Sequence, residues 1–288
     1  MWLFFGLVTV LMEFATTVWN NRLKLPAAQL NFWRCLYTTL ILSLGLPFLD
    51  YAHDSGFYIS ALFAGVTSTI TSISIFYTAR HHSAHTAALF MPVAMVLTFI
   101  GWTVVDPLFR AGLMAQPALA GIIMAAMLVA NIAIIKMRNI NIGGMQYGWL
   151  VALNASVIAI AHIFVKKTTG ATLNDVFLLS WILFFIQTLS SAFVCKVQGD
   201  GLGAPLFKLS FLFLCGCGFI RGFTLWFAVI LAPNPSFVAA LMLVVPFMTG
   251  LYHRLSRDDI HDSFLPGLIV TLCSIIIVAL SFGFRAGG

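Results

Sequence analysis

The amino-acid sequence predicts an all-α polytopic membrane protein, and three observations lead to that fold class. First, 61% of the 288 residues are hydrophobic and only 8% are charged, whereas a soluble domain carries roughly 25% charged residues. Second, the apolar residues form long runs, and the length of each run is close to that of a transmembrane helix, about 20 residues. Third, the runs lack the alternating pattern of transmembrane β-strands. A soluble globular fold is therefore excluded.

Ten apolar runs follow one another along the chain, and each is expected to form one transmembrane helix. The breaks between them contain Pro, Asp, Asn and basic residues, which interrupt helices or lie near lipid headgroups. The net charge of +6 comes from such loop residues, so nucleic-acid binding is not predicted. The runs cover residues 2–20, 29–49, 57–77, 84–105, 117–135, 146–165, 174–194, 209–231, 236–253 and 264–284.

An internal repeat divides the ten runs into two groups of five. Residues of the same type recur in the same order about 150 residues apart, as Trp33 does with Trp181 and Gly65 with Gly216. Because five is odd, the second copy must enter the membrane in the opposite orientation, as in transporters with inverted repeats. Chance similarity between apolar helices is the alternative. The two units are expected to cover residues 1–140 and 141–288.

Three short motifs give the chain a resemblance to a known family. They are N-F-W-R at 31–34, S-A-H-T-A-A-L-F-M-P-V at 83–93 and F-V-A-A-L-M-L-V-V-P at 237–246. With these motifs and its size, the chain resembles the EamA-type members of the drug/metabolite transporter superfamily. The resemblance implies a five-plus-five helix layout and secondary transport. It also implies a Glu at the ends of the fourth and ninth spans, where this chain has Asp106 and His253.

Glu13 is the only glutamate in the protein, and it lies near the middle of the first run. A charged side chain at that depth costs about 2.5–3.5 kcal/mol, so it is usually paired or lines a polar site. Because burial disfavours the charged form, Glu13 could exchange a proton near neutral pH or bind a cationic group. A structural partnership with a buried Arg or a backbone amide is the alternative.

Arg221 lies near the middle of the eighth run, between Gly218 and Gly222. Arginine stays protonated when buried and therefore needs an anion or several acceptors. A ligand anion and the Glu13 carboxylate are the two candidate partners. The repeat places Arg221 opposite the stretch 67–74, which has six hydroxyl side chains, Ser72 among them. This stretch is interpreted either as a polar cavity wall or as ordinary helix packing.

Other candidate site residues carry two interpretations each. His162, near the end of the sixth run, could relay protons or could be a packing histidine with a hydrogen bond. Trp33, Tyr77 and Trp226 could line a cavity, although aromatic residues near run ends commonly form an interfacial belt. Arg34 could belong to the site or could extend its side chain to the headgroups.

Neither a metal nor another cofactor is predicted. His81, His82 and His85 have the spacing H-H-x-x-H, but an interfacial polar cluster is favoured over a metal site. The five cysteines lie in or next to apolar runs and are interpreted as buried small side chains. The sequence also lacks a phosphate-binding glycine loop and the motifs of hydrolytic nucleophiles, so the protein is not expected to be an enzyme.

The orientation in the membrane has two conflicting predictions. With ten spans, nine Lys and Arg residues lie on the side opposite the termini and four on the side of the termini. The positive-inside rule then places the termini away from the cytoplasm. The family resemblance implies cytoplasmic termini, so both orientations stay open.

Taken together, the sequence predicts an inner (plasma) membrane secondary transporter for a small metabolite that resembles an amino acid and is zwitterionic or anionic. It would work by alternating access, with the proton as a candidate coupling ion, as a monomer or a homodimer. A flippase for a lipid or a lipid-linked carrier on the same fold is the alternative. A membrane enzyme or signalling subunit would need a second polar cluster at one membrane face, which the sequence does not reveal.

Overall fold

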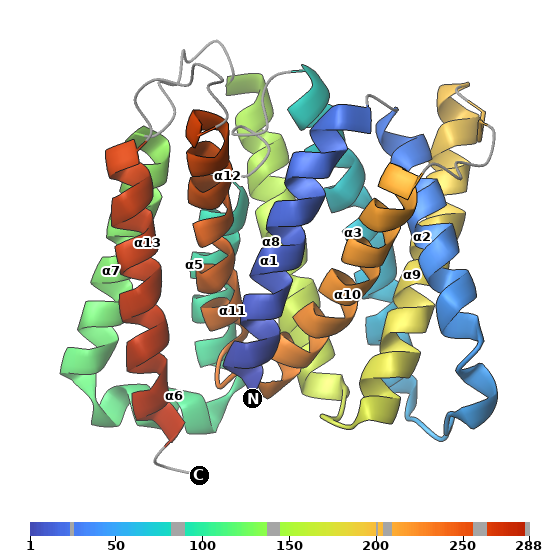
Figure 1. The fold of residues 1–288 in the computed structure, drawn as a ribbon. Helices are drawn as coiled ribbons and strands as arrows, with labels where there is room; N and C mark the ends of the chain where they lie inside the picture. Colours follow the sequence, from blue (N-terminus) through green and yellow to red (C-terminus); the bar gives the residue numbers. More distant parts are fainter. Residues whose placement is uncertain are drawn as a thin grey trace.

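The structure of the protein is a computed structural model, and it describes residues 1–23, 26–81, 90–136, 145–199, 201–203, 209–255 and 264–285. These residues form α-helices and short 3-10 helices, and none of them lies in a strand (Figure 1). The predicted all-α fold is confirmed. Within the described ranges, four helices are long and apolar enough to cross a bilayer, and a fifth span is obtained if one sharply bent pair is counted together. These long apolar helices indicate a membrane-embedded protein, whereas the number of ten spans stays a prediction.

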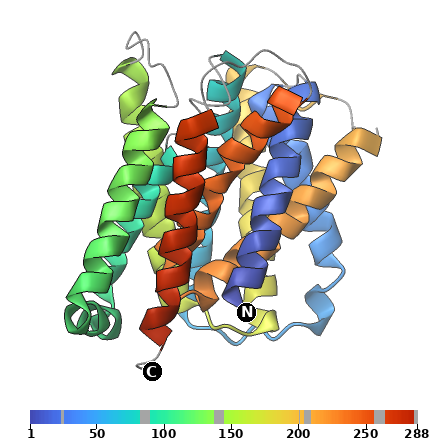
Figure 2. The ribbon, with the colours of Figure 1, turned by 60° about the vertical axis from the view of Figure 1, so that its left-hand side comes forward.

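Each predicted run of the first half corresponds to one helix, and one additional short helix appears. The additional helix, α6, follows α5 at a bend of 102° and lies across one end of the molecule (Figure 2). Asp106 caps α6, because its side chain accepts hydrogen bonds from the backbone N–H groups of Leu108 (3.0 Å) and Phe109 (3.2 Å). The elements are α1 (Trp2–Leu23), α2 (Ala27–Ser43), η1 (Leu46–Phe48), α3 (Ser55–His81), α5 (Phe90–Val105), α6 (Pro107–Ala115) and α7 (Pro117–Lys136).

The second half also follows the predicted runs, except that the ninth run is not one continuous helix. It divides at Leu243, because Pro246 has no N–H to donate to the carbonyl of Met242. At the break, the Leu243 N–H donates to the carbonyl of Ala240, three residues earlier, at 3.2 Å. The elements are α8 (Met145–Thr168), α9 (Leu173–Gln198), α10 (Leu209–Leu231), α11 (Pro235–Met242), α12 (Val244–Leu255), α13 (Phe264–Ser281) and η3 (Phe282–Arg285).

Helices from the two halves of the sequence pack side by side. α1 lies along α10, with Phe5 stacked on Phe227 near one end and Trp19 against Phe213 near the other, both at 4.8 Å between ring centroids. Since residue numbers rise along α1 while they fall along α10, the two helices are antiparallel. Further pairs join α2 with α9, α3 with α8 and α9, α5 with α8 and α11, and α7 with α13.

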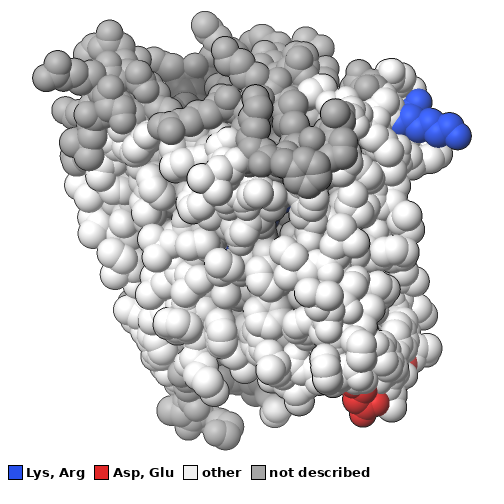
Figure 3. Space-filling model, turned by 45° about the vertical axis from the view of Figure 1, so that its right-hand side comes forward, with Lys and Arg blue, Asp and Glu red and all other residues white. Residues whose placement is uncertain are grey.

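Both termini lie at the same end of the molecule (Figure 1). On the face shown in Figure 3, Lys, Arg, Asp and Glu side chains of the described residues lie near the two ends, and the surface between them carries almost none. A broad uncharged surface between charged ends is typical of a protein whose middle contacts lipid tails. Charged side chains at mid-height are therefore expected inside the molecule.

Candidate functional site

The centre of the candidate site is an ion pair between Glu13 and Arg221. Each residue lies near the middle of its helix, Glu13 in α1 and Arg221 in α10. Both side chains are only 21% exposed. One turn away, the hydroxyls of Thr9 and Thr224 approach to 2.8 Å, which holds the same two helices in register. The pairing with Glu13, one of the two partners expected for Arg221, is thus present.

A cavity of about 90 Å³ lies beside this ion pair, large enough for several water molecules. Its wall is built by helices from both halves of the sequence, namely α2, α3, α5, α8, α9, α10 and α11. Five of the predicted site residues line it together: Arg34, Ser72, His162, Arg221 and Trp226. Residues far apart in the sequence therefore meet at one polar hollow.

Arg34 is buried rather than extended to the headgroups, with 4% of its surface exposed. Its Nη2 donates to the Asn31 side-chain oxygen at 2.8 Å, and the Asn31 amide donates to Ser191 of α9 at 2.8 Å. Gly218 of α10 makes room for the Arg34 side chain, since a Cβ at Gly218 would lie 3.0 Å from the Arg34 Cδ. These contacts fix a second guanidinium at the cavity.

The hydroxyl-rich stretch of α3 lines two different surfaces. Thr67, Ser68, Thr71 and Ser72 face the cavity, while Thr69 and Ser74 line an outer groove between α3 and α9. Part of the stretch thus lines the cavity, as the first interpretation expects. Thr69 fits the second interpretation, helix packing, because its hydroxyl donates to the Gly65 carbonyl of its own helix at 2.9 Å.

Oγ1 of Thr71 and Nδ1 of His162 are uncharged polar atoms buried at the cavity, and they have no hydrogen-bond partner within the part of the chain that the structure describes. The rings of His162 and Trp226 form a T-shaped contact, with 5.6 Å between their centroids and 90° between their planes. Buried polar atoms are normally satisfied by protein, water or a ligand. These two atoms therefore mark where a bound molecule can form hydrogen bonds.

The remaining predicted residues do not belong to the described cavity wall. The Trp33 indole N–H donates to the Leu202 carbonyl at 2.7 Å, and the ring packs near Tyr37. The side chain of Tyr77 falls outside the described residues, as do the side chains of His81, His82 and His85. Among the residues that are described, no cluster of three or more His, Cys, Asp or Glu side chains could hold a metal ion.

Sequence reasoning missed the residues that position Arg34. Asn31 stands three residues before Arg34, on the same face of α2, and this spacing could have indicated their contact. Gln187 also lines the cavity and accepts a hydrogen bond from the Cys35 thiol at 3.4 Å. Nothing in the sequence alone places α9 next to α2, so this contact had no available signal.

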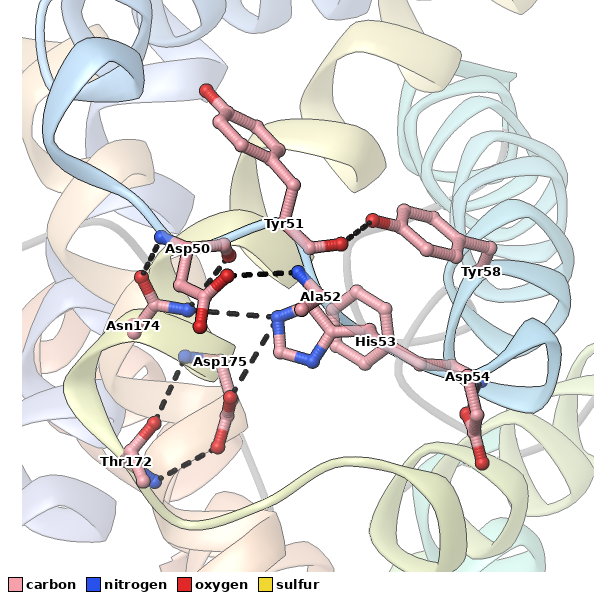
Figure 4. Close-up of polar contacts among 10 residues, drawn as sticks. Asp50, Tyr51, Ala52, His53, Asp54, Tyr58, Thr172, Asn174 and Asp175 are labelled. Atoms are coloured by element: carbon pink, nitrogen blue, oxygen red, sulfur yellow. Dashed lines mark hydrogen bonds and ion pairs between the residues drawn. The ribbon is translucent and has the colours of Figure 1, made fainter.

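A second polar cluster, which the sequence did not reveal, lies at one end of the molecule (Figure 4). The Asn174 amide donates to the Asp50 carbonyl at 3.0 Å and accepts from the Asp50 N–H at 2.8 Å. His53 lies 3.8 Å from the Asp175 carboxylate and stacks on Phe57. These contacts tie the segment before α3 to the start of α9. Because most of them involve backbone groups, the cluster is explained as a structural link.

Comparison with protein-family models finds no match for the chain, and no curated protein sequence matches it. The family resemblance therefore stays a prediction from three short motifs.

Proposed function

We propose that the protein is a secondary transporter that moves a small zwitterionic or anionic metabolite across the inner (plasma) membrane. The observation that carries the proposal is the Glu13–Arg221 pair beside a cavity lined by both halves of the chain. Ionisable residues at mid-depth are costly and commonly mark substrate or ion pathways. In this proposal the cavity opens to one side of the membrane at a time, by rocking of two inverted five-helix repeats.

The pattern of helix packing supports the inverted repeat. If α1, α2, α3, α5 and α7 correspond to α8, α9, α10, α11–α12 and α13, each major contact has a counterpart. The contact of α1 with α10 corresponds to that of α8 with α3, and the contact of α3 with α9 to that of α10 with α2. The contacts α2 with α9, α5 with α11 and α7 with α13 correspond to themselves. Contacts that correspond to one another in pairs, or to themselves, are expected for two copies related by a twofold axis.

Two glycine contacts support the same correspondence at the level of single residues. A Cβ at Gly65 of α3 would lie 2.8 Å from Ile186 of α9, and one at Gly218 of α10 would lie 3.0 Å from Arg34 of α2. The glycines are 153 residues apart and their partners are 152 apart. These contacts thus favour pairing Gly65 with Gly218 rather than with Gly216, and an α2–α9 offset four residues longer than that between Trp33 and Trp181.

The ion pair provides a physical basis for a gate. A substrate anion that reaches Arg221 competes with the Glu13 carboxylate for the same guanidinium. Once displaced, Glu13 is left without its cationic partner in a partly buried site, which is unfavourable. A cation that enters together with the substrate would relieve this cost, and the proton is the coupling ion that we propose.

The test uses the single variants Glu13→Gln and Arg221→Gln and the double variant, reconstituted in proteoliposomes. Uptake of a labelled panel of amino acids and small carboxylates is measured with an inward proton gradient. Each single variant leaves one buried charge unpaired and is expected to fold less stably, by about 3–5 kcal/mol. The double variant regains stability but takes up nothing. Recovered uptake in the double variant would show that the pair is only structural.

A lipid flippase is the second candidate, and an outer groove favours it. This groove of about 590 Å³ lies between α3 and α9, and apolar Val66, Ile70 and Phe193 line it beside the hydroxyls of Thr69 and Ser190. A lipid could enter a polar path from this side. Loss of fluorescence when dithionite is added to vesicles containing headgroup-labelled phospholipid distinguishes the two functions. Faster headgroup exposure without solute uptake would favour the flippase.

A further inference from the structure

We infer that the cavity recognises a carboxylate on a small apolar body and discriminates against an ammonium group on the same body. This inference rests on the proposed transport function and names its substrate class. Three features of the described residues carry it: the two guanidiniums, the distribution of acidic side chains, and the apolar wall.

The cationic side of the cavity is already adapted to a carboxylate. Arg221 binds the carboxylate of Glu13, so its guanidinium is oriented for this group. Arg34 reaches the same cavity from α2, held by Asn31 and by its passage over Gly218. Guanidinium groups present several N–H donors in a planar arrangement that matches a carboxylate. An incoming carboxylate can therefore take the place of Glu13 while Arg34 adds a second cationic donor group.

Acidic side chains are almost entirely absent from the membrane-spanning runs. Glu13 is the only glutamate, and the eight aspartates all lie at or between the ends of the predicted runs. The described residues that line the cavity include no acid. Glu13 lies on α1, outside this wall. A substrate ammonium within the cavity would therefore lose its water with no carboxylate in the wall to pair with, and it would lie near two positive charges. Burial of an unpaired charge is strongly unfavourable.

The rest of the wall fits an apolar body. Met91 of α5, Ile158 of α8, Leu225 of α10 and Val238 of α11 line the cavity, together with the Trp226 ring. Binding pockets for small molecules commonly combine such apolar walls with a few polar groups that fix orientation. Contact with these side chains would stabilise an aliphatic chain, because it removes apolar surface from water. The cavity volume of about 90 Å³ favours a short chain.

Three probes with the same branched aliphatic body separate the alternatives: isocaproate carries only a carboxylate, isoamylamine only an ammonium, and leucine carries both. Binding to the full-length purified protein is measured by titration calorimetry. Isocaproate is expected to bind at least tenfold more tightly than leucine, and isoamylamine should not bind. The variant Arg34→Gln should weaken isocaproate binding at least tenfold. Arg110→Gln, which changes an exposed arginine, should leave it unchanged.

Each outcome bears on one of the two proposals. Leucine binding as tightly as isocaproate, or binding of isoamylamine, would overturn the inferred substrate class. If leucine or isoamylamine binds in this way and is also taken up by proteoliposomes, the inferred substrate class is wrong but the proposed transport function is supported. If isocaproate binds but is never taken up, the recognition stands and transport is contradicted. If none of the three probes binds, the inferred class is wrong.

Discussion

At the scale of single residues, the Glu13–Arg221 pair is the feature that most needs a functional explanation. Replacing a buried ion pair by apolar residues is often neutral or stabilising, so such a pair is weak support for stability alone. Here the pair is largely buried at the middle of two helices and adjoins a cavity. The proposed role in binding an exchangeable anion would explain why two costly charges occupy this place.

Glu13→Gln is expected to tighten the binding of isocaproate at least tenfold, or about 1.4 kcal/mol. The reason is that the substituted side chain no longer competes for Arg221. Titration calorimetry on the purified variant measures the change. An unchanged or weaker affinity would contradict the competition between Glu13 and the ligand.

Gly218→Ala is expected to weaken isocaproate binding at least tenfold, because the new Cβ would lie 3.0 Å from the Arg34 Cδ and displace that side chain. Gly216→Ala is the matched control, since a Cβ there has no atom within 4 Å. The control should keep its affinity and gain about 1 kcal/mol of helix stability. Equal affinities of the two variants would show that Arg34 is not positioned through Gly218.

At the scale of elements, Lys166 joins the end of α8 to the end of α10. Its Nζ donates to the carbonyls of Ile230 (2.7 Å) and Ala232 (2.6 Å) and lies 5.1 Å from the Trp102 ring centroid. Carbonyls at the C-terminal end of a helix lack intrahelical partners and carry the negative end of its dipole. Lys166 therefore stabilises this end of α10.

Lys166→Met is expected to destabilise the protein by about 1–3 kcal/mol, because two carbonyls lose their charged donor. The melting temperature in detergent measures the loss. Lys167→Met is the control: this neighbour is exposed, so its removal should change stability by less than about 0.5 kcal/mol. Equal melting temperatures for both variants would refute the anchoring role.

The N-terminal end of α9 provides a separate element-scale prediction. The Thr172 hydroxyl accepts from the Asp175 N–H at 3.1 Å, while the Asp175 carboxylate accepts from the Thr172 N–H at 3.3 Å and lies near His53. Asp175→Ala should cost about 1 kcal/mol through the loss of this capping box. Thermal unfolding measures it, and an unchanged midpoint would be the contrary result.

The location of most helices was predictable from the sequence, because runs of about 20 apolar residues need no tertiary information. The break at Leu243 and the short α6 were missed, although Pro246 and Asp106-Pro107 supplied local signals for both. The burial of Arg34 was not predictable, since it depends on Gly218 in a helix that is distant in sequence. Likewise, the assembly of the cavity depends on contacts between the two halves.

At the scale of the whole molecule, the proposed inverted repeat places two halves related by a twofold axis around one cavity. The termini lie at the same end (Figure 1), which an even number of crossings requires. A reporter that is active only in the cytoplasm, fused after Gly288, decides between the two predicted orientations. Activity would support the orientation implied by the family resemblance, and inactivity would support the distribution of Lys and Arg.

The central claim, that the cavity is reached from both sides of the membrane, can be tested with a single cysteine. Ser72→Cys is placed in a variant whose five native cysteines are replaced by alanine, and a membrane-impermeant maleimide is added from either side of oriented proteoliposomes. Ser190→Cys, in the outer groove, is the control that lipid should shield. The account predicts that Ser72→Cys is labelled from both sides and is protected by isocaproate. Labelling from one side only, or equal labelling of the control, would contradict it.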